Sequence, residues 1–398
     1  TWVAGMPVNL RTHGHGQGYT DLNFLIPELV SRIDYRKGSY SAEQGDFSSA
    51  GSVYISYFDE LPSGLGQVGG GNFGFGRLLA ADSPKVGRGK FLYGLELSQY
   101  DGPWVNPEDF QKVNGVLRYS DRLGKTRYSL TGMAYKGDWN STDQIPVRAV
   151  RSGRLDRFGA IDPSDGGESH RYSLSGEVSR PGSRGDETKA NAYFIDYKLN
   201  LFSNFTYFLD NPTRGDQFQQ ADRRQVYGVN ASHRWQARFG ERTAENVLGF
   251  QFRYDDIGPV ALYKTERRKR YDITRRDSVR EGSYAPYFEN RVRWNPWLRS
   301  IVGARWDAYT FDVDSSIAAN SGSTSDSIFS PKLSLILGPW SDTELYFHVG
   351  RGFHSNDARG TTIRIDPNTG TPVRPVTPLV RADFAEVGVR TAAVRNLQ

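Results

Sequence analysis

Apolar and polar side chains alternate from about residue 65 onward, in runs of roughly ten residues. In residues 171–179, Leu174 and Val178 fall on one face of the run and Glu177 falls on the other. This period of two predicts β-strands that separate an apolar from a polar environment. The same pattern recurs in residues 90–100, 246–255 and 344–350.

The polar connections between these runs alternate between short and long. A soluble β-sandwich would show the same alternation within its strands, so the connections carry more weight. Short turns on one rim and long loops on the other are typical of outer-membrane barrels. The short links are predicted at 121–125, 181–187, 239–243, 294–298 and 338–342, and the long ones at 101–110, 139–168, 201–223, 256–281, 313–327 and 354–380.

Tryptophans lie near the predicted strand ends, where a ring that is both apolar and polar suits a membrane–water interface. The alternative is that they are ordinary core residues. We count about fourteen strands from residue 65 onward, and the patterns together predict an all-β, antiparallel transmembrane β-barrel. The tryptophans concerned are Trp104, Trp139, Trp235, Trp294, Trp297 and Trp340.

Composition narrows the function classes. The chain has 43 Gly, 22 Tyr and 22 Phe but a mean hydropathy of −0.59, which suits a sheet with one apolar and one wet face. With no cysteine, disulfides and thiolate sites are excluded. The net charge of +5 is dispersed among nearly equal numbers of acids and bases, so we predict no nucleic-acid partner. No catalytic arrangement stands out, and we predict that the protein is not an enzyme and binds no cofactor.

The glycine-rich run 68–76 lacks the Lys-Ser/Thr of a phosphate-binding loop and is predicted to be the first tight hairpin of the barrel. Residues 1–60 do not follow the strand rhythm. Their glycines and prolines indicate a separate small mixed unit, so we predict two domains, 1–60 and 61–398.

A motif in the front segment carries a family resemblance. Residues 26–38, IPELVSRIDYRKG, followed by AEQG and SAGSV, resemble the last half of the plug domain of TonB-dependent receptors. The resemblance implies that Gly38, Gly45 and Gly51 lie where the plug backbone turns sharply, a role that glycine fills because it tolerates positive φ. Ser39 departs from the proline usual in the family at that position.

Two later strands resemble the same family, 345–353 as a strand that rises into a long extracellular loop and 385–390 as the strand that descends after it. The family resemblance places the second at about the fourteenth of about 22 strands. We therefore expect the chain to be a fragment: half a plug and an incomplete barrel. It begins without a signal peptide or TonB box and ends at residues 396–398 without a terminal aromatic residue.

The resemblance also implies a charge lock between the plug and the barrel wall, formed by Arg32 and Glu386. Strand alternation agrees in part, because it places Glu386 on the lumen face. The alternative is a solvated lumen charge that pairs with a neighbouring strand.

Two segments offer candidate ligand contacts. His13 and His15 form a His-x-His pair in a glycine-rich loop that could bind copper, zinc or a metal chelate, although no third ligand is in reach by sequence and no metal site is assigned. A polar loop without a ligand is the alternative. The other segment opens a long loop and is either a ligand contact or a structured loop base; it contains His354, Asn356, Asp357 and Arg359.

By resemblance, the expected function is active uptake of a scarce ligand, such as an iron-siderophore or another metal chelate, through the outer membrane of a Gram-negative bacterium. The expected partners are the TonB–ExbB–ExbD complex, outer-membrane lipid and lipopolysaccharide, and the full-length protein is expected to be a monomer. The basic run 267–270 could hold lipopolysaccharide or an acidic ligand, and the alternative is a solvated loop. The alternatives are a passive porin, which has no plug, and a soluble secreted adhesin or binding module.

Overall fold

A computed structural model describes residues 1–394 of the chain, without the side chain of residue 239, and contains two β-sheets. The smaller sheet has four strands in the order β2-β1-β4-β3. It belongs to residues 1–57, which we call the N-terminal unit. Its elements are β1 (Trp2–Val3), β2 (Met6–Pro7), the 3-10 helix η1 (Pro27–Leu29), β3 (Val30–Lys37) and β4 (Gly51–Tyr57).

The larger sheet, which we call the wall, is antiparallel, and each strand pairs with its neighbours in sequence along a path of fourteen strands from β5 to β19. The two-residue strand β7 (Lys85–Val86) lies off this path and pairs with β8. The all-β fold and the count of about fourteen strands are therefore confirmed. The other strands are β5 (Leu65–Gly70), β6 (Gly76–Asp82), β8 (Gly89–Tyr100), β9 (Phe110–Leu123), β10 (Thr126–Asn140), β11 (Gly166–Pro181), β12 (Glu187–Ser203), β13 (Phe218–Phe239), β14 (Arg242–Glu266), β15 (Lys269–Asn295), β16 (Leu298–Ser315), β17 (Gly322–Trp340), β18 (Thr343–Ser355) and β19 (Leu379–Thr391).

The predicted long connections at 101–110, 139–168, 201–223 and 354–380 do contain loops, and short helices lie in two of them, α1 (Val147–Arg151) and α2 (Ala358–Thr361). The predictions of two other long loops were wrong. Residues 256–281 are mostly strand, because β14 and β15 continue to a tight hairpin at 267–268. Residues 313–327 hold only a short link with the 3-10 helix η2 (Ala318–Asn320).

The reason for these two errors is that the strands stay polar beyond the apolar band. Thr265, Arg275 and Asp277 face inward and are buried, so a run of polar residues here is a lumen-facing strand and not a loop. No helix in residues 1–394 combines the length and hydropathy needed to cross a membrane. The part of the prediction that concerned residues 396–398 lies outside the described residues.

The polarity of the wall is the reverse of that of a soluble sheet. Its outward face exposes large apolar side chains on strand after strand, while many of the alternating residues on the inward face are polar or charged and buried. The tryptophans of two short turns, Trp297 and Trp340, stack with ring centroids 6.4 Å apart and are half exposed. Examples of the outward apolar residues are Leu97, Leu117, Leu130, Leu174, Val229, Phe250, Phe288, Phe329, Leu335 and Phe347.

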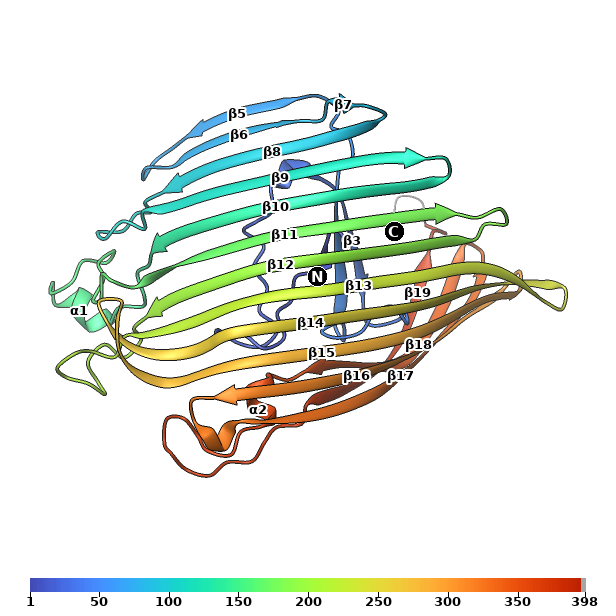
Figure 1. The fold of residues 1–398 in the computed structure, drawn as a ribbon. Helices are drawn as coiled ribbons and strands as arrows, with labels where there is room; N and C mark the ends of the chain where they lie inside the picture. The colour runs from blue at the N-terminus through green and yellow to red at the C-terminus, as the bar shows by residue number, and fades with distance from the viewer. Residues whose placement is uncertain (395–398) are drawn as a thin grey trace.

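The N-terminal unit lies on the concave side of the wall, where β3 is visible behind the middle strands (Figure 1). It packs on one flank of the wall through a shared hydrophobic cluster. This cluster joins Met6, Ile26 and Leu29 of the unit to wall residues on β6, β8 to β10, β12 and β13, among them Leu79, Leu92, Val116, Met133 and Ile195. Contact at Gly94 is close: a Cβ there would lie 2.5 Å from a methyl carbon of Leu29.

The reversed polarity predicts the effect of one charge on the outward face. Leu174 is 49% exposed and lies midway along β11. In the native-length protein, Leu174→Arg is expected to lower the free energy of unfolding in lipid vesicles by about 2–4 kcal/mol, since it places a cation in hydrocarbon. Ser183→Arg, in the turn after β11, is the control and should change it by no more than about 0.5 kcal/mol. Equal effects of the two substitutions in denaturant titrations would contradict a membrane-facing surface.

Candidate functional site at the interface between the N-terminal unit and the wall

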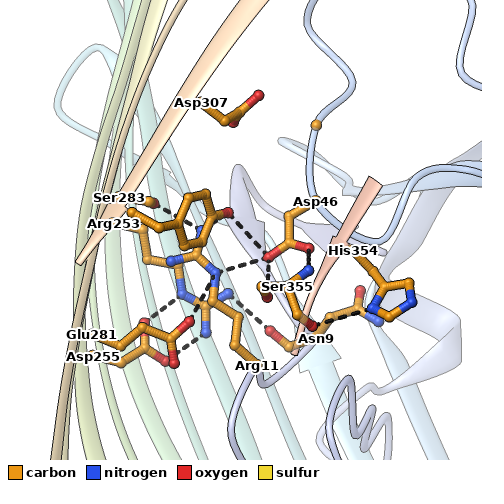
Figure 2. A network of polar contacts seen from close by, with 12 residues as sticks. Asn9, Arg11, Asp46, Arg253, Asp255, Glu281, Ser283, Asp307, His354 and Ser355 are labelled. Atoms are coloured by element: carbon orange, nitrogen blue, oxygen red, sulfur yellow. Dashed lines mark hydrogen bonds and ion pairs between the residues drawn. The ribbon is translucent and has the colours of Figure 1, made fainter. Parts of the chain in front are cut away.

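Arg11 of the N-terminal unit reaches the inner face of the wall and is 6% exposed. Its Nε donates to Oδ2 of Asp46 at 3.0 Å, and its Nη2 donates to Ser283 Oγ and to Tyr309 Oη, both at 2.8 Å. The wall carboxylate Glu281 lies 4.0 Å from Nε and is fully buried. Figure 2 shows the guanidinium between Asp46 on one side and the wall carboxylates on the other.

Asp46 ties the unit to a second part of the wall. Its carboxylate accepts hydrogen bonds from the backbone N–H of Ser355 at 2.8 Å, from Ser355 Oγ at 2.7 Å and from Tyr309 Oη at 3.1 Å. Because Ser355 ends β18 and Tyr309 lies on β16, one carboxylate of the N-terminal unit links two wall strands.

Burial makes this network electrostatically strong. Desolvation alone would lower the pKa of Arg11, but Tyr309, Asp46 and Glu281 more than offset it, and the pKa is raised above its usual value. The arginine therefore stays charged. A buried charge that loses its partner is costly because no water replaces the lost contact.

Neighbouring wall arginines also donate to the backbone of the N-terminal unit. Arg253 forms a 2.6 Å ion pair with Asp255 and donates from Nη1 to the carbonyl of Asn9 at 2.8 Å. Arg224 pairs with Asp222 and donates from Nη2 to the carbonyl of Thr12. In each case the aspartate holds the guanidinium in place while its remaining N–H groups bind the unit.

Side chains of three adjacent wall strands, β15, β16 and β17, form hydrogen bonds with the loop at residues 39–45. Lys332 Nζ on β17 donates to Ser39 Oγ and to the carbonyls of Ser41 and Gln44, each at 2.7 Å. Glu289 on β15 accepts from the backbone N–H of Ala42 at 2.8 Å and from Ser41 Oγ at 2.9 Å. The loop's donors and acceptors are thus satisfied by complementary wall charges.

Arg305, on the strand between those two, fixes the end of the same loop. It pairs with Asp307 at 2.8 Å and donates to the carbonyl of Glu43 at 3.0 Å. A Cβ at Gly45 would lie 2.6 Å from its Cζ, so glycine is required there by the close approach of the guanidinium.

The other two glycines named from the sequence have different constraints. Gly38 has a φ of +72°, the left-handed conformation that glycine adopts without strain. At Gly51, a Cβ would lie 2.7 Å from the carbonyl oxygen of Arg36, since β3 and β4 pair closely at that point.

The two residues of the predicted His13–His15 pair lie in different environments, one buried and one exposed. His13 is fully buried, stacks on Tyr19 with ring centroids 4.3 Å apart and accepts the backbone N–H of His15 on Nδ1 at 3.1 Å. Burial lowers its pKa to about 3, so the ring is neutral. His15 is exposed, with Nδ1 2.8 Å from Gln220 Oε1. Within the described residues, no group of three His, Cys, Asp or Glu side chains is placed to hold a metal ion.

The segment 354–359 lies against the loop that contains these histidines. Arg359 Nη2 donates to the carbonyl of His13 at 3.0 Å, and the backbone N–H of Ala358 donates to Thr12 Oγ1 at 2.8 Å. Asp357 caps α2 and forms a 2.7 Å ion pair with Arg359. The structure therefore brings together candidates from opposite ends of the sequence, and most of their polar groups bind each other.

Two further candidates make only local contacts. Asn356 Nδ2 donates to the carbonyl of Thr377 at 2.7 Å, which closes the base of the loop. The ring of His354 is half-buried and stacks on Phe47 with centroids 6.1 Å apart.

The predicted lock between Arg32 and Glu386 has no counterpart among the ion pairs of residues 1–394. Arg32 instead pairs with Asp34 at 2.8 Å, and its side chain is 70% exposed. The carboxylate two residues along the same strand is nearer than any on β19. Besides an ion pair between Glu28 of the unit and Arg77 on β6, 2.7 Å apart, the charged side chains that join the unit to the wall include Arg11, Asp46 and Lys332.

Sequence reasoning missed these three residues, although one signal was available. Arginine and aspartate recur two positions apart, which places both on the same face of a strand. Lumen-facing pairs that show this spacing are Asp222–Arg224, Arg253–Asp255, Arg275–Asp277 and Arg305–Asp307.

Comparison with known proteins agrees with this architecture. The family model described as "TonB dependent receptor-like, beta-barrel" matches residues 99–396. The structure is similar to that of the ferric citrate transporter FecA in its unliganded form, with a TM-score of 0.78 at 12% identity. The similarity covers 98% of this chain and 58% of that one. The comparison with curated protein sequences found no match.

Two other solved structures give the same picture. The siderophore receptor PiuA from Acinetobacter baumannii has a TM-score of 0.73 at 12% identity, over 99% of this chain and 62% of that one. The FrpB iron transporter from Neisseria meningitidis (F5-1 variant) has a TM-score of 0.68 at 16% identity, over 98% of this chain and 62% of that one. These likenesses show the fold, and the chain spans about three fifths of each structure's length.

The network around Arg11 predicts a large cost for removing one cation. In the native-length protein, Arg11→Met is expected to lower the free energy of unfolding by about 3–5 kcal/mol, because it leaves Asp46 and Glu281 buried without their counter-charge. The matched control is Arg32→Met, which breaks an exposed pair and should cost about 0–1 kcal/mol. Denaturant titrations that give the two variants equal stability would show that Arg11 does not hold the unit.

Proposed function

Since this chain belongs to the TonB-dependent receptor family, whose members reside in the Gram-negative outer membrane, we propose that it mediates active uptake of a scarce ligand across that membrane. The observation that carries this proposal is the buried ionic interface that holds the N-terminal unit inside the wall. A passive pore needs an open lumen, whereas here the inner wall charges are engaged by residues of the unit.

The N-terminal unit is the part that must move for a ligand to pass. Most of its contacts with β13 to β18 are hydrogen bonds and ion pairs, and water can take over such contacts once the interface opens. A mechanical pull on the unit supplies the work of breaking several buried contacts at once. We assign this pull to the TonB–ExbB–ExbD complex, which draws on the proton gradient, as the family membership implies.

For the ligand, we propose a metal chelate such as an iron-siderophore. Proteins of similar fold are described as a ferric citrate transporter, a siderophore receptor and an iron transporter, which supports this class. Among the residues considered as ligand contacts, the exposed ring of His15 and the half-buried ring of His354 are the proposed contacts.

Uptake assays in whole cells test the proposal. Cells that express the native-length protein as their only receptor are given a panel of radiolabelled iron chelates, with and without tonB. We expect at least one chelate to accumulate above the level in receptor-free cells, and deletion of tonB to abolish this accumulation while surface binding of the chelate persists. Accumulation that is unchanged by the deletion would contradict active uptake and indicate a passive pore.

A further inference from the structure

Six arginines are buried in the described part of the chain, and five of them lie within 4.0 Å of a carboxylate. The sixth is Arg171 on β11, which is 3% exposed and has no ion pair with any described residue. Because a buried guanidinium without a counter-charge is costly, the exception calls for a partner. The five paired arginines are Arg11, Arg224, Arg253, Arg275 and Arg305.

The surroundings of Arg171 do not neutralise it. Its register neighbours on the two adjacent strands are Tyr135 and Tyr197. Phe24 of the N-terminal unit covers one face of the guanidinium, with Cζ 4.6 Å from the ring centroid. A cation–π contact stabilises a cation but provides no opposite charge.

The charged and titratable groups that act on Arg171 come from the unit and from the wall. Asp21 is the carboxylate among them, and it lies beyond ion-pair distance. Arg253 adds a second positive charge, and the others are the phenols of Tyr57 and Tyr197. The site is therefore electropositive.

The two nitrogens of Arg171 that are buried without a hydrogen-bond partner are Nε and Nη2. Together they form one edge of the guanidinium, with two parallel N–H groups that match the two oxygens of a carboxylate. Tyr197 Oη, on the next strand, and Ser173 Oγ, two residues along β11, are also buried without a partner.

We propose that the Nε–Nη2 edge of Arg171 is a binding site for the carboxylate group of a small molecule, held between the N-terminal unit and the wall. The carboxylate accepts both N–H groups of this edge and supplies the missing counter-charge. The site goes beyond the uptake proposed above and does not depend on it, since it requires only the folded interface. Phe24 covers one side of this site, so a ligand enters when the N-terminal unit moves away from the wall.

Acetate is the probe for this site. The native-length protein in detergent is equilibrated overnight with sodium acetate or sodium nitrate at equal ionic strength, and its thermal unfolding is measured. We expect acetate to raise the Tm in a saturable manner relative to nitrate. Arg171→Gln should weaken the apparent affinity for acetate at least about tenfold, because it removes the charge and the paired donors.

Two variants serve as controls. Arg171→Lys keeps the charge but not the bidentate edge, so it should also bind acetate more weakly, and it answers the question if the Gln variant fails to fold. Arg127→Gln changes an arginine whose side chain is 66% exposed and should leave the acetate effect unchanged.

Three results would overturn the proposal. The first is a wild-type Tm that responds equally to acetate and nitrate, and the second is a full acetate response in both Arg171 variants. The third is a crystal structure of the native-length protein in which one of its own carboxylates lies within 4 Å of Nε or Nη2. A crystal grown with bromoacetate should instead show anomalous density for bromine beside this edge. None of these results depends on whether the protein transports a ligand.

Discussion

The structure depends on one constraint: a membrane-facing wall whose apolar side chains point outward leaves its charged side chains buried on the inside. Such charges are stable only where each finds a partner, because little water reaches them. Aspartates two residues from the wall arginines provide part of the compensation, and the N-terminal unit provides the rest through Arg11, Asp46 and backbone carbonyls. The buried charges of the wall therefore help to hold the unit in place, because the unit supplies part of their hydrogen-bond and ion-pair partners.

The two flanks of this interface differ in kind. Toward β6, β8 to β10 and β12, the unit shares a hydrophobic cluster with the wall, to which the Glu28–Arg77 ion pair is added, while toward β13 to β18 most of its contacts are hydrogen bonds and ion pairs. Water can replace polar partners when the surfaces part, whereas separation of the apolar flank exposes hydrocarbon to water. This asymmetry makes the ionic flank the side at which the unit separates more readily from the wall.

Period-two alternation predicted the strands, and the alternation of short and long connections, together with the family resemblance, predicted the barrel. The period-two pattern failed at 256–281, where exposed polar residues such as Asp256, Lys264 and Glu266 replace the outward apolar side chains, so the strands resemble a loop in sequence. The sequence also did not predict which residues join the unit to the wall. The family resemblance pointed to Arg32, whereas residues far apart in the chain, such as Arg11 and Tyr309, form a contact between the unit and the wall. The loop segments of His13 and Arg359 were recognised as polar, but their mutual contact arises only from folding.

The central claim, that the N-terminal unit must move relative to the wall, is tested most directly by a reversible covalent link between them. A Cβ at Gly352 on β18 would lie 3.5 Å from Cβ of Ser49, which suits a disulfide, and the chain contains no other cysteine. Uptake by the Ser49→Cys, Gly352→Cys protein should stop under oxidising conditions and return on reduction, while each single variant transports under both conditions and ligand binding is retained. Full uptake by the cross-linked protein would contradict the account.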